Sequence, residues 1–90
     1  MTNIMVAKNT LKDYGVWRTL FDGNAAMQAQ YGLHIKGVYQ SKEDPNTVFV
    51  VLEVDDMARA QEMMKKAQES GLFDKAGIID ADRTLCIDVT

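Results

Sequence analysis

The chain has few of the residues that build metal centres, disulfides and nucleotide sites. Among its 90 residues are one cysteine, Cys86, and one histidine, His34. Neither an intrachain disulfide nor a zinc site of the usual four-ligand kind can be built from them. The six glycines are scattered along the chain and form no phosphate-binding loop. We therefore expect no metal site and no phosphate-cradling loop.

Long apolar runs and basic clusters are also missing. No stretch approaches the length of a membrane-spanning helix, and residues 1–8 lack the basic start and the long apolar segment of a secretion signal. The formal net charge is −3, and Lys65–Lys66 is the only basic pair. This charge disfavours nucleic acid and anionic membrane as partners. We expect a single cytoplasmic domain over residues 1–90, and the lone cysteine fits that reducing compartment.

One segment, Thr47–Val54, is apolar on both faces of the strand it predicts. Alternate residues of an extended strand share a face. One face carries Val48, Val50, Leu52 and Val54, and the other carries Phe49 and Val51. Such a strand needs cover on both sides of its sheet.

The remaining pattern predicts a complete α+β domain. Strands are expected at residues 4–9, 33–41, 47–54 and 83–89, and helices at 13–31 and 56–69. Asp13 is the expected N-cap of the first helix, either Asp55 or Asp56 that of the second, and Ser70 that of an extra helical turn ending at Gly77. The order βαββαβ predicts a ferredoxin-like fold, with a four-stranded antiparallel sheet and two helices on one face.

Two helices cover only one face of such a sheet. A second copy of the chain is the expected cover for the other face, through two sheets packed face to face in a symmetric dimer. The alternative is a monomer that leaves a large apolar face in water, which soluble monomers rarely do.

Three segments resemble a known superfamily. They are Asp13-Tyr14-x-x-Trp17-Arg18-x-x-Phe21-Asp22, the stretch Asp44–Val48 leading into a strand that ends Leu52–Asp56, and Ser70-Gly71-Leu72-x-x-x-Ala76-Gly77. Together they are similar to the dimeric α/β-barrel proteins, which include antibiotic biosynthesis monooxygenase-like proteins and relatives labelled cyclase. The resemblance implies a homodimer without metal, flavin or other cofactor. It also implies an apolar, often aromatic substrate bound between sheet and helices.

Candidate ligand-binding residues come from the inward stripe of the first helix. Trp17 and Phe21 lie on that stripe, and Asn24 and Gln28 fall within the same arc. Buried amides must be hydrogen-bonded. They either reach backbone carbonyls or a trapped water, or they line a ligand cavity. Tyr39, from the second strand, is the aromatic residue expected from the sheet.

A candidate acid–base pair comes from the central hairpin. With the turn centred between Glu43 and Asp44, His34 lies opposite Glu53, with Cβ atoms about 5 Å apart. A histidine oriented by a carboxylate is the arrangement of a general base, and it is equally that of an ordinary cross-strand pair. A register slip of one residue would separate the two side chains. The pattern leaves open which sheet face carries them.

These observations predict a homodimeric protein that binds a small apolar molecule. One form of the hypothesis is a cofactor-independent monooxygenase- or cyclase-like enzyme acting on an aromatic or polyketide-like substrate, with His34 as the proton acceptor. The alternative is a non-catalytic dimeric binding or stress-response module. An enclosed cavity beside Trp17 and Asn24 favours the first form, and a solid core favours the second.

Overall fold

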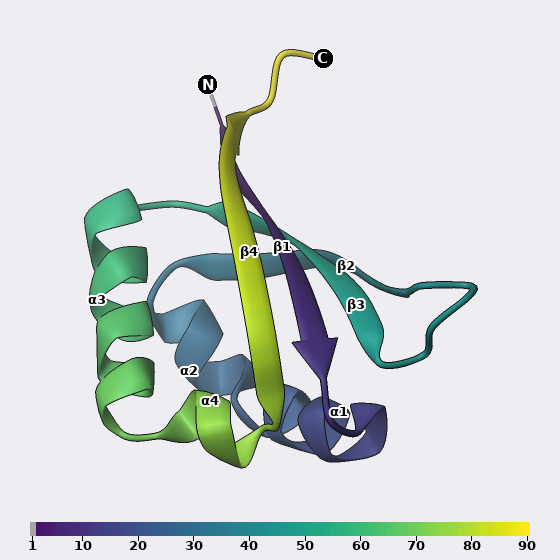
Figure 1. The fold of residues 1–90 in the computed structure, drawn as a ribbon. Helices are drawn as coiled ribbons and strands as arrows, with labels where there is room; N and C mark the ends of the chain where they lie inside the picture. Colours follow the sequence, from purple (N-terminus) through teal and green to yellow (C-terminus); the bar gives the residue numbers. More distant parts are fainter. Residues whose placement is uncertain (1) are drawn as a thin grey trace.

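The computed structural model describes residues 2–90 and confirms the ferredoxin-like α+β fold. The elements in chain order are β1 (Asn3–Leu11), α1 (Tyr14–Gly23), α2 (Ala25–Gln30), β2 (Leu33–Gln40), β3 (Thr47–Val54), α3 (Met57–Glu69), α4 (Leu72–Lys75) and β4 (Ile78–Ile87). The strands form one antiparallel sheet in the order β2-β3-β1-β4. The helices gather on one side of it (Figure 1). Among residues 2–90, no helix combines the length and apolar character that crossing a membrane requires.

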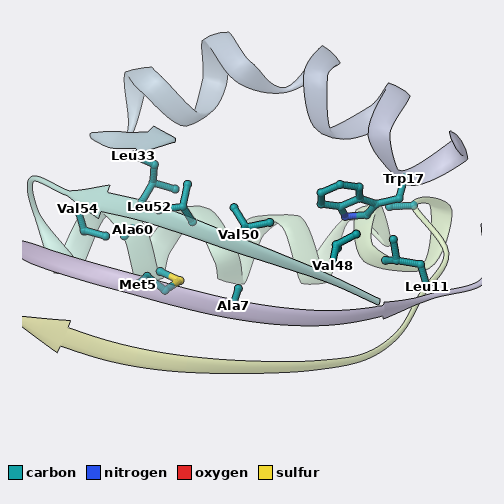
Figure 2. Packing of buried hydrophobic residues seen from close by; sticks show 11 residues of the cluster. Met5, Ala7, Leu11, Trp17, Leu33, Val48, Val50, Leu52, Val54 and Ala60 are labelled. Carbon is teal, nitrogen blue, oxygen red and sulfur yellow. The ribbon is translucent and has the colours of Figure 1, made fainter. Parts of the chain in front are cut away.

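Strand alternation decides which side chains enter the core. In β3 one predicted face, Val48, Val50, Leu52 and Val54, is at most 8% exposed, whereas Phe49 on the other face is 36% exposed. β1 supplies the matching inward row, with Met5, Ala7 and Leu11 buried. Figure 2 shows Trp17 reaching from α1 onto this layer beside Val48. The predicted two-faced character of β3 is therefore confirmed.

The first helical segment departs from the prediction of one helix over residues 13–31. α1 ends at Gly23, α2 starts at Ala25, and Asn24 joins them. Glycine weakens the helix here, and the Asn24 side chain donates to the Leu20 carbonyl at 3.0 Å, a local bond that competes with regular helix. The predicted N-cap is confirmed, because Asp13 accepts from the N–H groups of Gly15 and Val16.

The C-terminal boundaries also differ from the prediction. α4 is preceded by Gly71 with φ 76° rather than capped by Ser70, which follows the end of α3. Gly77, with φ 74°, ends the turn as predicted. β4 begins at Ile78 rather than at Arg83. Its first half alternates acidic and apolar residues, which suits an edge strand but lacks the continuous apolar signal of an inner one.

A β-bulge in β2 reverses the sheet face to which the residues of its second half point. His34 lies opposite Glu53 as predicted, but the register shifts between Ile35 and Gly37, so Val38 pairs with Val50 and Tyr39 with Phe49. Without this shift, the register that pairs His34 with Glu53 would pair Lys36 with Val51 and Val38 with Phe49, so these two expected pairs do not form. Simple alternation would likewise place Tyr39 on the same face as Leu33 and Ile35, and it lies on the opposite face. One extra residue reverses the alternation of everything that follows it.

The two adjacent aspartates before α3 offer a test of helix capping. Asp56 accepts from the N–H groups of Ala58 and Arg59, whereas Asp55 contacts His34 at the surface. We expect Asp56→Ala to lower the free energy of unfolding by about 1 kcal/mol, the usual cost of a lost N-cap. Asp55→Ala is the matched control and should cost less, because exposed ion pairs contribute little. Urea denaturation measures both; an equal or larger loss in the control would contradict the assignment.

Candidate functional site

Two adjoining cavities of about 80 and 110 Å³ lie between the sheet and the helices. We call them the outer and the inner cavity, respectively. Both are lined by Trp17, Phe21, Gln28, Met63, Phe73 and Ile78. Asn24 belongs to the outer cavity alone, and Asn9 and Arg83 belong to the inner one alone. The space beside Trp17 is therefore a cleft that is partly open to solvent, neither an enclosed cavity nor a solid core.

Aromatic rings form one wall of this space. Trp17, 3% exposed, stacks on Phe21 with ring centroids 4.7 Å apart and an interplanar angle of 21°. Their spacing of four residues along α1 places both rings on the face of the helix that meets the sheet. Phe73 of α4 also lines both cavities. The three rings therefore give the cavities a largely apolar, aromatic lining.

The two predicted amides behave differently. The Asn24 side chain is already bonded to the Leu20 carbonyl, as expected for a structural amide. The Gln28 Oε1 atom is buried and finds no hydrogen-bond partner among residues 2–90. Both amides line the outer cavity, but Asn24 fits the backbone-satisfied alternative, whereas the oxygen of Gln28 is left without a partner.

A third amide, Asn9, was not identified from the sequence. It is 7% exposed, and its Oδ1 atom also lacks a partner among residues 2–90. The signal was present in the inward row of β1, where Asn9 stands between Ala7 and Leu11 at a position that alternation assigns to the core. An amide there is an unusual choice, because an apolar side chain would be buried without any unpaired oxygen.

Arg83 was also not identified from the sequence as a site residue, since it was only the expected first residue of the last strand. It lies opposite Ala7 in the sheet and therefore shares the helix-side face with Asn9. Its guanidinium carbon stands 5.1 Å from the centroid of the Phe73 ring. Among the described residues it supplies the one charged side chain that lines the two cavities.

The predicted acid–base pair does not reach the cavities. Glu53 alternates with the inward residues of β3 and so lies, with His34 opposite, on the face away from the helices. The His34 Nε2 atom is 2.7 Å from Oδ2 of Asp55, and Glu53 instead pairs with Lys36 at 3.0 Å. The predicted carboxylate partner of His34 is thus wrong, although the predicted register is right.

Tyr39 is likewise outside the cavities. It follows the bulge, lies beside Phe49 on the outer face and is 57% exposed. Its ring covers Gly37, where any Cβ would collide with it. The sheet therefore contributes Asn9 and Arg83 to the candidate site in place of His34, Glu53 and Tyr39.

The middle of the outer sheet face is apolar and is left uncovered by residues 2–90, with charged side chains such as Lys8 and Glu53 beside it. Its central members alternate with the buried rows of β1, β3 and β4 and are half-buried or exposed; they are Ile4, Val6, Phe49, Val51 and Cys86. We call them the open-face patch. Within residues 2–90, His, Cys, Asp and Glu side chains form no group of three or more placed to hold a metal ion.

The unpaired oxygen of Gln28 has a measurable consequence for stability. We expect Gln28→Met, which keeps a similar length and removes the polar group, to raise the free energy of unfolding of the ligand-free protein by about 1 kcal/mol. Gln30→Met, at an exposed position of α2, is the control and should change it by less than about 0.5 kcal/mol. Chemical denaturation measures both variants. A clear destabilisation by Gln28→Met would mean that the native amide is satisfied in the folded state.

No family model matches the sequence, and no curated protein matches it. Solved structures match it closely in fold. A protein assigned as an antibiotic biosynthesis monooxygenase from Bordetella bronchiseptica superposes with a TM-score of 0.79 at 10% identity, covering 99% of this chain and 98% of its own. SnoaB, a cofactor-independent oxygenase from Streptomyces nogalater, gives 0.76 at 12% identity, covering 99% and 94%, respectively.

A third match comes from a differently named group. A NIPSNAP family protein from Agrobacterium tumefaciens gives a TM-score of 0.72 at 11% identity, covering 99% of this chain and 94% of its own. Identities this low establish shared architecture and leave activity open. The resemblance drawn from the sequence is confirmed at the level of fold: the chain shares the architecture of solved structures described as antibiotic biosynthesis monooxygenase and NIPSNAP family proteins.

Proposed function

We propose that the protein binds a small aromatic molecule between the sheet and the helices of each subunit of a homodimer. One observation carries the proposal. Asn9 and Gln28 present buried, unpaired oxygens beside a wall formed by Trp17 and Phe21. A buried acceptor without a partner costs on the order of 1–3 kcal/mol. A ligand that donates a hydrogen bond to each oxygen would recover that cost.

The volume of the site limits the size of the guest. An apolar cavity of about 150 Å³ suffices for benzene. The inner and outer cavities, at about 110 and 80 Å³, adjoin one another and together suit one ring or two fused rings. A larger polycyclic substrate would require the wall at α4 to move. The proposal therefore narrows the expected ligand to a small aromatic compound with hydrogen-bond donors.

A second candidate function is cofactor-independent oxygenase- or cyclase-like chemistry in the same cavity. The observation that favours it is the fold shared with SnoaB, which is described as a cofactor-independent oxygenase. His34 lies on the sheet face opposite the cavity, so it cannot act as the general base there. The residue available to hold a developing anion is Arg83, because Asn9 and Gln28 present their oxygens rather than their N–H groups as the buried, unpartnered atoms.

The dimer part of the proposal follows from the open-face patch. Val6 and Val51 pair side by side on it, and Phe49 is 36% exposed. Exposed apolar patches of this kind mark interaction surfaces. A second copy is the simplest occupant, because a two-fold axis lets one patch cover itself and leaves charged rim residues such as Lys8 at the edge. Two twisted sheets would then pack face to face.

Filling the outer cavity should abolish ligand binding. Ala67 of α3 is 6% exposed and lines that cavity. We expect Ala67→Leu to occupy the space and to weaken binding of phenol and 2-naphthol at least tenfold, with the fold intact. Trp17 is the only tryptophan. Its single indole N–H signal in NMR spectra therefore reports on occupancy directly.

Ala58→Leu, at an exposed position of the same helix, is the matched control and should bind as the native chain does. If neither phenol nor 2-naphthol shifts the indole signal of the native protein at millimolar concentration, the binding proposal fails.

A charge placed in the open-face patch should separate the subunits. We expect the native protein to sediment at twice its 10.1 kDa chain mass at micromolar concentration. Val51→Lys should sediment as a monomer with an unchanged circular dichroism spectrum, because burying an unpaired ammonium in an interface is costly. Gln61→Lys, on the exposed surface of α3, should remain a dimer. A native protein that sediments as a monomer would contradict this part of the proposal.

A further inference from the structure

We infer that the ligand is an aromatic acid and that Arg83 binds its carboxylate. The inference rests on the proposed binding function and names the chemical class of its ligand. It starts from a guanidinium at the inner cavity, where the other lining residues are apolar or uncharged.

Two contacts restrict the position of the Arg83 side chain. β4 places it opposite Ala7, and its guanidinium lies over the face of Phe73 at 5.1 Å. A cation over a ring face is held by the ring's negative electrostatic surface. A guanidinium held in this way keeps its N–H donors available at its edge. Although Arg83 is exposed to solvent, this contact holds its unused donor fork at the cavity.

The other two arginines have protein partners. Arg18 binds the Asp22 carboxylate at 3.0 Å, and Arg59 donates to the backbone carbonyl of Gln30. Among residues 2–90, Arg83 makes neither an ion pair nor a hydrogen bond. The chain holds 13 acidic against 10 basic residues, so a lack of carboxylates does not explain this. The fork geometry matches a carboxylate in two parallel hydrogen bonds.

The rest of the inner cavity defines the other end of the ligand. Asn9 and Arg83 lie on adjacent strands in diagonal positions, since Asn9 pairs with Ala81 and Ala7 with Arg83. Diagonal neighbours are separated by about 7–8 Å. A single-ring molecule can therefore place a carboxylate on Arg83 and a hydroxyl or amino donor toward the unpaired oxygens of Asn9 and Gln28. Hydroxybenzoates and aminobenzoates are the simplest compounds of this class.

Three probes distinguish the contribution of the carboxylate charge to binding from that of the aromatic ring. They are 4-hydroxybenzoate, its neutral methyl ester and phenol, each titrated against the native dimer with the Trp17 indole signal as readout. We expect the acid to bind at least about tenfold more tightly than the ester, as one charge-assisted carboxylate contact predicts. Arg83→Gln should weaken binding of the acid at least tenfold and change the dissociation constant of phenol less than twofold.

Two further variants serve as controls for this interpretation. Arg83→Lys keeps the charge without the planar fork and should retain part of the preference for the acid. Arg59→Gln removes an arginine that does not line the cavities and should change none of the three affinities. Equal binding of acid and ester by the native protein, or an unchanged acid affinity in Arg83→Gln, would overturn the inference and leave the binding function standing. Failure of all three probes to bind would overturn both.

Discussion

The structure depends on one constraint, which is that β3 carries apolar side chains on both of its faces. One row, made of Val48, Val50, Leu52 and Val54, packs in the core with β1 and the helices. The other row, Phe49 and Val51, remains on the outer face of the same strand. A single layer of helices cannot cover both rows, because it lies on one side of the sheet. The core, the cavities and the proposed subunit contact all follow from this division.

Much of the fold could be predicted because it rests on local signals. Alternation identified both faces of β3, Asp13 marked the start of α1, and Gly77 marked the end of α4. The bulge at Lys36 was not foreseen, although Gly37 directly after it is the kind of isolated strand glycine that often marks a bulge. The early start of β4 was hidden because its pairing with β1 supplies what its own apolar content lacks.

The candidate site was predicted only in part. The residues that were found come from the first helical segment, and the residues that were missed come from the sheet. Trp17 and Phe21 lie on α1 and Gln28 lies on α2, and one helical periodicity assigned all three to the site although the helix is broken at Asn24. Asn9 and Arg83 complete the cavity from two strands that are far apart in sequence, so their proximity depends on sheet order. His34 and Glu53 were brought together by correct register reasoning, yet register does not say on which side of a sheet a pair lies. Only the position of the helices decides that.

The extra residue in β2 has a consequence for how this chain can change over time. Ahead of it Leu33 faces the helices; beyond it Val38 does so, and Tyr39 turns outward. Loss of the extra residue, Lys36, would leave Val38 opposite Val50 and Tyr39 opposite Phe49, because the bulged residue has no partner of its own in β3. The bulge is therefore a position at which this edge strand can shorten by one residue while the core and the outer face keep the same side chains.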